Sequence, residues 1–288
     1  MTTVPLETTT RPARGHRPGR GAGGLTATTL TRGSSLALGV AVTWFSMLVL
    51  IPLTALVVTA AGGGWESYVT TLTNPQTLQA VQLTVGLSLV VTAVNVVIGT
   101  VIAWVLVRDQ FWGKRVLDVV IDIPFALPTI VAGLVLLSLY GRQGPLGLDW
   151  ANTRIAVFLA LAFVTLPFIV RTVQPVLEEL EHDVEEAAAS LGAGRLTVFR
   201  RIILPSLFPA IAAGAARSFA RAISEYGSLV LLSGNLPFRT EVVSVRVISF
   251  IEGGSTESAA AVASVMLAIA LLVIVVLDVV QRRVARRG

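Results

Sequence analysis

Hydrophobic runs separated by short polar links make up most of the chain after its first 35 residues. The runs cover about residues 36–61, 78–107, 117–140, 155–176, 206–233 and 258–280. Each run reaches the roughly 20 residues that a helix needs to cross the hydrocarbon core of a bilayer. The pattern therefore predicts an all-α, polytopic membrane protein with six transmembrane helices.

The composition supports this class and excludes others. Hydrophobic residues make up 54% of the 288 residues and charged residues only 14%, whereas a soluble domain carries about a quarter charged residues. The absence of cysteine excludes disulfides and cysteine-ligated metals, and His16 and His182 lie apart in polar segments, so we expect no metal site. Since no histidine falls in a predicted span, Ser224 beside Glu225 lacks the base of a hydrolytic triad, and no catalytic site is expected.

The net charge of +5 is concentrated on one side of the predicted membrane. One set of links and ends holds 15 Lys and Arg residues: Arg11, Arg14, Arg17, Arg20, Arg32, Arg108, Lys114, Arg115, Arg195, Arg200, Arg201, Arg282, Arg283, Arg286 and Arg287. The opposite links hold four: Arg142, Arg154, Arg239 and Arg246. The positive-inside rule therefore predicts cytoplasmic N- and C-termini. This distribution also explains the charge without a nucleic-acid partner.

The regions outside the long core differ in composition. Residues 1–35 are rich in Thr, Gly, Pro and Arg and predict a disordered, basic cytoplasmic tail. The run 36–61 is too long for the core of a signal peptide and predicts a retained first transmembrane helix. The link that follows contains Trp65 and Tyr68, aromatic residues that favour a short interfacial helix.

The longest polar segment between the runs reads EEAAASLGAGRLTVFRRIILP, residues 185–205. Acidic residues precede it, and Gly192 can adopt the left-handed conformation that ends a helix. The residues after the glycine predict a second short helix, and Pro205 can open the next span. Periodicity alone fits a solvated loop and a docking surface equally well.

The order of residues in this segment matches a longer pattern, E-A-A-x3-G-x9-I-x-L-P. It resembles the EAA loop of bacterial ABC importer permeases, and the resemblance extends over a core of residues 78–281. It implies the type I importer permease fold and a cytoplasmic coupling loop, residues 178–205. The residues implied to couple to the ATPase are Glu186, Ala187, Ala188, Gly192, Ile202, Leu204 and Pro205. In the family, Glu186 would face the ATPase, the alanines would allow close approach, and Gly192 would form the bend.

The chain contains no G-x-x-x-x-G-K-[ST] motif, so it lacks the phosphate-binding loop of a P-loop ATPase. The resemblance therefore implies two copies of a separate cytoplasmic ABC ATPase that bind ATP and Mg, with no cofactor in this chain. It further implies a second, related permease subunit, an extracytoplasmic sulfate-binding protein and a bacterial plasma (inner) membrane as the location.

Two stretches carry a narrower resemblance. The sequences IDIPFALPTIVAG and SFARAISEYGSLVLLSG resemble the sulfate, molybdate and tungstate branch, and most closely the T-subunit sulfate/thiosulfate permeases. Ile123 stands where that branch often has leucine, and Pro128-Thr129 where molybdate permeases tend to have two prolines. The implied solutes are sulfate and thiosulfate, and a molybdate/tungstate permease is the alternative. An ion-coupled secondary transporter is the alternative of another class, but the spans offer only Glu225 and Asp122 for a proton relay.

Three charged residues of the fifth predicted span are spaced by four. Arg217, Arg221 and Glu225 would lie on one helical face, each offset by about 40° from the last. Such residues usually face the interior of a bundle or water, so they can line or gate the path of an anion. The alternative is a structural ion pair between Arg221 and Glu225. Arg171 is predicted to extend to the cytoplasmic surface.

Three prolines lie well inside two of the predicted spans, the third and the fourth. Pro124, Pro128 and Pro167 each remove a backbone donor and bend a helix. They can act as flex points during transport or as fixed kinks, and we favour fixed kinks.

Overall fold

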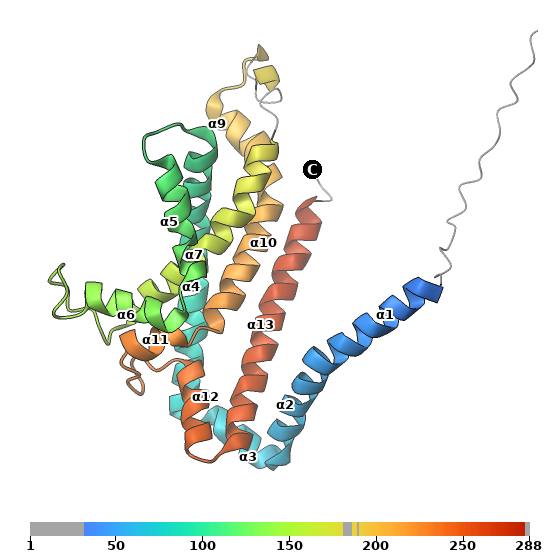
Figure 1. Ribbon diagram of the computed structural model, residues 1–288, viewed down its shortest axis with the longest axis vertical. Coiled ribbons are helices and arrows are strands. Elements are labelled where there is room, and N and C mark those ends of the chain that lie inside the picture. Colours follow the sequence, from blue (N-terminus) through green and yellow to red (C-terminus); the bar gives the residue numbers. More distant parts are fainter. Residues whose placement is uncertain (1–31, 181–185, 189, 286–288) are drawn as a thin grey trace, which may run out of the picture. The chain divides into compact units, whose positions relative to one another are not determined.

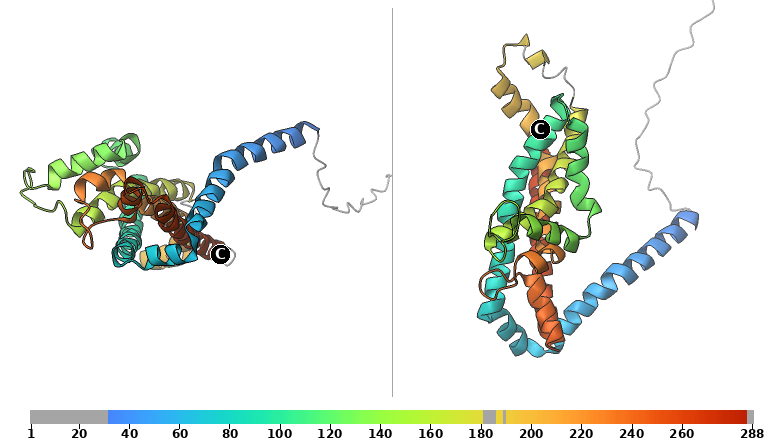
Figure 2. Two further views of the ribbon diagram at one scale, coloured as in Figure 1. Left: turned by 90° about the horizontal axis from the view of Figure 1, so that it is seen from below. Right: turned by 60° about the vertical axis from the view of Figure 1, so that its left-hand side comes forward.

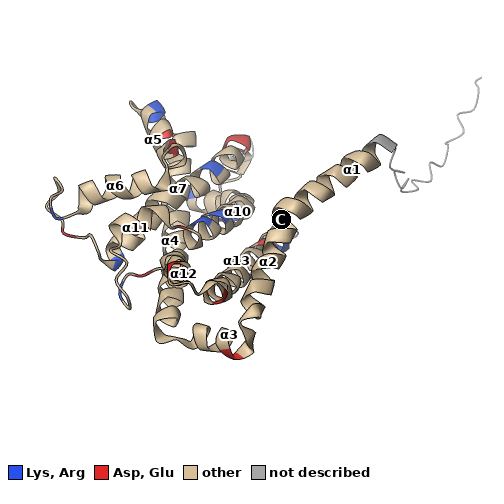
Figure 3. Cartoon of the chain, turned by 60° about the horizontal axis from the view of Figure 1, so that its bottom comes forward, with Lys and Arg blue, Asp and Glu red and all other residues tan. Residues whose placement is uncertain are grey.

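The computed structural model describes residues 32–180, 186–188 and 190–285. The predicted tail, residues 1–35, lies almost entirely outside this described part of the chain. All regular elements in the described part are helices (Figure 1), which confirms the all-α prediction. Lys, Arg, Asp and Glu are sparse along the helices (Figure 3).

The structure separates into two units, residues 1–50 and 51–288. In the first unit, α1 (Arg32–Phe45) continues into a π-helix, η1 (Ser46–Leu50). Nearly every described side chain of this unit is exposed, including Trp44 and Met47. This apolar surface fits a helix that is surrounded by lipid.

Four long helices form the body of the second unit: α4 (Pro75–Arg108), α7 (Arg154–Glu179), α10 (Leu204–Ile223) and α13 (Thr256–Ala285). Helices α4, α7 and α10 all contact one another, and α10 packs against α13. Figures 1 and 2 show α4, α10 and α13 running along one direction. Helix α2 (Ile51–Gly62) packs on α13, and α3 (Gly64–Thr73) links α2 to α4.

Local capping residues define where two of these helices begin. The Asn74 side chain accepts hydrogen bonds from the backbone N–H groups of Gln76 and Thr77, and Pro75 occupies the first turn of α4. Thr153 caps α7 in the same way, by accepting from the N–H of Ala156 at 3.2 Å. Both arrangements satisfy donors that a helix start leaves free.

The predicted third crossing, residues 117–140, is wrong as a single helix. The chain forms α5 (Lys114–Ala126) and α6 (Thr129–Tyr140), which meet at an angle of 118°. Leu127 is extended and Pro128 caps α6, because the residue before a proline is driven out of the α conformation. The pair is one broken crossing or a re-entrant segment.

The predicted fifth crossing, residues 206–233, is wrong at both ends. The helix begins at α9 (Arg195–Val198), passes through a π-helix, η2 (Phe199–Ile203), and ends with α10 at Ile223. A separate short helix, α11 (Gly227–Leu232), follows. Helix α11 packs against α6, and both lie across the direction of the long helices (Figure 1). Helix α12 (Val243–Glu252) then leads to α13.

Five helical stretches of the described chain are long and apolar enough to cross a bilayer, or six if the bent pair counts as one crossing. The five are Ser34–Gly62, Pro75–Arg108, Arg154–Glu179, Arg195–Ile223 and Thr256–Arg283. The loop between α4 and α5 and the segment leading into α9 lie at the same end of the second unit (Figure 1).

Candidate functional site

The segment around Gly192 forms the bend that its glycine predicts. Residues 186–188 are helical, and Gly192 has a φ of 84°, in the left-handed region. The N–H of Ala193 donates to the carbonyl of Ala188 at 3.0 Å. This bond, five residues back across a left-handed glycine, is the Schellman arrangement that ends helices. The predicted glycine-terminated helix is therefore present, although residues 181–185 and 189 lie outside the described residues.

The C-terminal half of the motif anchors the segment to the helix bundle. Val198 and Ile203 are buried in a cluster with Ile169 and Leu207, and Ile202 packs against that cluster. Pro205 has no N–H to donate, and the helix widens into the π-helix η2 just before it. The residues that follow Gly192 are therefore packed against both α7 and α10.

The N-terminal half of the motif faces outward. Glu186, Ala187 and Gly192 are exposed, and Ala188 is half-buried. Two leucines that our reading of the motif passed over are also exposed, Leu191 by 90% and Leu196 by 68%. These two side chains leave apolar surface open to solvent within a polar segment. The sequence feature that could have drawn attention to Leu191 and Leu196 is their position on either side of Gly192.

The expectation that Arg217, Arg221 and Glu225 share one helical face is wrong for Glu225, although Arg217 and Arg221 do lie four residues apart on α10. Helix α10 ends at Ile223, so Glu225 lies in the link between α10 and α11. Its carboxylate nevertheless folds back to Arg221, with Nη1 of Arg221 at 2.6 Å from Oε2 of Glu225. The side chain of Glu225 is 1% exposed and that of Arg221 27%.

Glu225 joins three helices. Its Oε1 accepts hydrogen bonds from the backbone N–H and the hydroxyl of Ser228, both at 2.8 Å, at the start of α11. Its backbone carbonyl accepts from the hydroxyl of Ser244 on α12 at 2.7 Å. Both carboxylate oxygens therefore have donors, as a buried charge requires. This arrangement favours the alternative that we considered, a structural ion pair between Arg221 and Glu225. We call Glu225, Arg221, Ser228 and Ser244 the Glu225 hub.

Arg217 has different surroundings. It is exposed, and its Nη1 donates to the hydroxyl of Thr172 on α7 at 3.3 Å. Among the described residues no Asp or Glu lies within ion-pair distance of Arg217. Within a membrane span, a guanidinium with spare donors and no carboxylate partner is suited to contact an anion.

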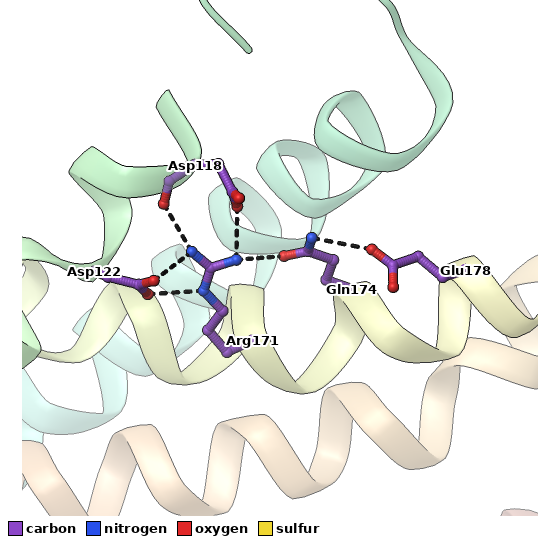
Figure 4. A network of polar contacts seen from close by, with 5 residues as sticks. All are labelled: Asp118, Asp122, Arg171, Gln174 and Glu178. Atoms are coloured by element: carbon purple, nitrogen blue, oxygen red, sulfur yellow. Dashed lines mark hydrogen bonds and ion pairs between the residues drawn. The ribbon is translucent and has the colours of Figure 1, made fainter. Parts of the chain in front are cut away.

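Arg171, which we expected to extend to the cytoplasmic surface, is half-buried in a contact with α5. It binds Asp118 and Asp122 of α5, with each carboxylate 2.7 Å from the guanidinium (Figure 4). Our sequence analysis missed this cluster because the partners are 49 and 53 residues away in the chain. The available signal was the spacing of four between the aspartates, which places both on one face of a helix.

The three prolines lie in different backbone settings. Pro124 lies inside α5 and Pro167 inside α7, and both helices continue past them. Pro128 lies at the break between α5 and α6, so the change of direction there is far larger than a kink. The break lets α6 meet α11, where a Cβ on Gly133 would lie 2.6 Å from the carbonyl oxygen of Ser228. Only glycine permits that approach.

Comparisons with known proteins agree with this architecture. Residues 95–287 match the family described as binding-protein-dependent transport system inner membrane component. The sulfate transport system permease protein CysT of Salmonella typhimurium is 41% identical over 262 residues, which cover 88% of this chain and 95% of that protein. CysT of Escherichia coli is 40% identical over 263 residues, with the same coverage.

Solved structures show the same fold at low identity. The bacterial ABC transporter involved in the import of the acidic polysaccharide alginate matches with a TM-score of 0.72 and 17% identity, over 86% of this chain and 94% of that chain. The inward-facing MetNI methionine ABC transporter matches with a TM-score of 0.57 and 19% identity, over 72% and 95%.

These comparisons confirm the predicted resemblance to ABC importer permeases and to their sulfate branch. They also account for the lack of catalytic residues in our reading of the chain, since the family comprises membrane components. The chain belongs to the family of binding-protein-dependent transport system inner membrane components, the non-catalytic permease subunits of ABC transporters.

Proposed function

We propose that this chain is the permease subunit of an ABC importer that carries sulfate, and also thiosulfate, into the cytoplasm. The observation that carries the proposal is the identity of 40–41% to sulfate transport system permeases over 88% of the chain. The similarity to the alginate and methionine transporters supports the fold but says nothing of the solute, because their identity is below 20%.

The energy for transport comes from a partner. The exposed surface of Glu186, Ala187, Leu191 and Leu196 is suited to dock on a cytoplasmic ABC ATPase. Two copies of that ATPase bind ATP and Mg, and their closure moves the coupling segment. The anchoring of the segment on α7 and α10 carries this movement into the membrane.

The orientation follows from the arginine distribution. With the bent pair α5–α6 as one broken crossing, both termini and the segment 178–205 lie in the cytoplasm of a bacterial cell. One such subunit supplies half of a path, so a second, related permease completes it. An extracytoplasmic binding protein delivers the anion at the opposite end.

Among the described residues, we assign Arg217 to contact the anion. It lies on α10 with spare donors, and a dianion that crosses an apolar bundle needs such donors. Arg221 and Glu225 act on the path indirectly, because their charges pair with each other within the chain. The 118° turn at Pro128 between α5 and α6 brings α6 against α11, next to Glu225.

Uptake of labelled sulfate tests the proposed solute. Cells that lack this subunit should fail to accumulate labelled sulfate, and cells that receive it back should recover. Excess thiosulfate should compete, and excess molybdate should compete weakly. Equal competition by molybdate would instead favour the molybdate/tungstate alternative, and recovery without the ATPase subunit would contradict an ABC importer.

A further inference from the structure

The cluster around Arg171 connects two helices through one side chain. Nε and Nη2 of Arg171 donate to the two carboxylate oxygens of Asp122, each at 2.7 Å. Nη1 donates to the carboxylate of Asp118 at 2.7 Å and to Oε1 of Gln174 at 2.8 Å, and Nη2 also donates to the backbone carbonyl of Asp118 at 2.7 Å. The guanidinium therefore uses all five of its donors (Figure 4). We call Arg171, Asp118 and Asp122 the α5 clamp.

Apart from the clamp, α5 packs on the bundle through few side chains, chiefly Ile121 and Leu117. Ile121 is its one buried residue, and the ring of Phe125 packs edge-on against Phe168 of α7 at 5.0 Å. Its other large apolar side chains are mostly exposed: Val116, Val119, Val120 and Ile123. Burial of so few side chains stabilises the position of a helix only weakly, so the clamp is the main specific contact between α5 and α7.

The chain changes direction at both ends of α5. Gly113 precedes the helix with a φ of 89°, and Pro128 follows it at the 118° turn into α6. A cavity of about 750 Å³ borders the clamp at the cytoplasmic end, lined in part by Lys114, Asp118 and Glu178. The helix therefore has a bend at each end and open space beside one of them, which allows it to pivot when the clamp opens.

A change in the position of α5 can be transmitted to the Glu225 hub through α6. Gly133 of α6 lies against the backbone of Ser228, close enough that a Cβ there would clash. Ser228 in turn supplies two of the hydrogen bonds to Glu225. Since the packing at Gly133 leaves no gap, a displacement of α6 has to move Ser228 or break its contacts.

We propose that Arg171 is a positioning residue of the transport cycle. Through Asp118 and Asp122 it sets the position of α5, and through α6 and Ser228 that position sets the geometry of the Glu225 hub. The role of Arg171 depends on the proposed function in one respect only, because one of its two tests measures sulfate uptake. Because the three charges are 28–49% exposed, the clamp can exchange its partners with water as α5 moves.

The conservative variant Arg171→Lys tests the clamp. Lysine keeps the charge but has three donors on one nitrogen, so it cannot span two carboxylates and a carbonyl. We expect the maximal rate of sulfate uptake to fall about tenfold, with an unchanged half-saturating concentration and an unchanged amount of protein in the membrane. Arg282→Lys is the matched control, because the Arg282–Asp278 pair is 72% and 46% exposed and lies within one helix.

A distance measurement supplies the second readout. The chain has no native cysteine, so Val119→Cys on α5 and Glu179→Cys on α7 can carry spin labels at two exposed positions. In the reconstituted transporter we expect one narrow distance distribution with Arg171 and a broad one with Arg171→Lys. Asp118→Asn, which keeps the bidentate pair with Asp122, should broaden the distribution less. If Arg171→Lys fails to fold, the distances in Asp118→Asn still test the role of the clamp.

The outcomes separate the two proposals. If the unaltered protein imports sulfate while Arg171→Lys shows the same rate and the same distances, the clamp has no positioning role. A raised half-saturating concentration with unchanged distances would also overturn the proposal, because it would make Arg171 a contact of the solute. If the unaltered protein does not import sulfate, the proposed function fails, and the distance distributions still decide the role of the clamp.

Discussion

The coupling segment and the Glu225 hub place charged residues in opposite surroundings. In the segment, Glu186 is exposed beside the exposed leucines Leu191 and Leu196. In the hub, the side chain of Glu225 is 1% exposed and has an ion-pair partner and two further donors. The side chain of Glu186 is open to solvent, whereas that of Glu225 is enclosed by contacts within its own chain.

This difference separates the two ways in which a residue supports transport. An exposed residue that makes no internal contact contributes little to stability, so its replacement alters activity alone. A buried carboxylate with satisfied partners contributes to stability, and its removal leaves those partners unsatisfied. The two regions should therefore respond to substitution in different measurements, and the predictions below are arranged by the size of the expected effect.

Gly192→Val should have the largest effect on transport. Valine is a β-branched residue that rarely adopts the φ of 84° found at Gly192, so the bend before α9 would rearrange. We expect sulfate uptake to be abolished while the protein still inserts and keeps its melting temperature in detergent. The measurement is labelled uptake together with the amount of protein in the membrane.

Gly64→Val is the matched control for this bend. Gly64 has a φ of 80° and, like Gly192, open space around the position of a Cβ. The backbone strain is therefore similar, but Gly64 begins α3 rather than the coupling segment. Uptake should persist in the control. Normal uptake in Gly192→Val would show that the bend plays no part in coupling.

Glu225→Ala should have the largest effect on stability. The change removes the partner of Arg221 and the acceptor of the Ser228 N–H and hydroxyl. Breaking a fully buried pair costs about 3–5 kcal/mol, and the partial exposure of Arg221 reduces this to roughly 2–3 kcal/mol. Thermal unfolding of the purified protein in detergent measures the loss.

The pair Asp278–Arg282 supplies the control, because it has the same spacing of four but is largely exposed. Asp278→Ala should change the free energy of unfolding by less than about 0.5 kcal/mol. Equal losses in the two variants would mean that burial at Glu225 contributes nothing, and the hub would then be no different from a surface ion pair.

The parts of the molecule that could be predicted from sequence are those encoded locally. The hydrophobic runs predicted helices where α4, α7 and α13 lie, because lipid exposure requires nearly continuous apolar residues. Gly192 predicted a left-handed helix end, since a glycine there satisfies the carbonyls of the last turn. In both cases the information lies within one turn or one run.

The rest depends on contacts between distant residues. Hydropathy stays high through Leu127 and Pro128 and again through α11, so it contains no sign of the 118° turn or of the end of α10 at Ile223. Those breaks are stabilised by the approach of Gly133 to Ser228 and by the contacts of Glu225. Pairing of Arg171 with Asp122 likewise depends on how α5 packs on α7, which no local pattern specifies.

Arg217→Gln should have the smallest effect of the three, and it sharpens the contrast with Glu225. Arg217 has no carboxylate partner among the described residues and makes one long hydrogen bond, 3.3 Å to Thr172, so its removal leaves little unsatisfied. We expect an unchanged melting temperature. Loss of one donor to the anion should raise the half-saturating sulfate concentration about three- to tenfold, as for a net hydrogen bond of roughly 1 kcal/mol. Arg217→Lys, which keeps the charge, should recover most of the affinity. A variant that loses stability without a change in half-saturation would place Arg217 with the structural residues of the hub rather than on the anion path.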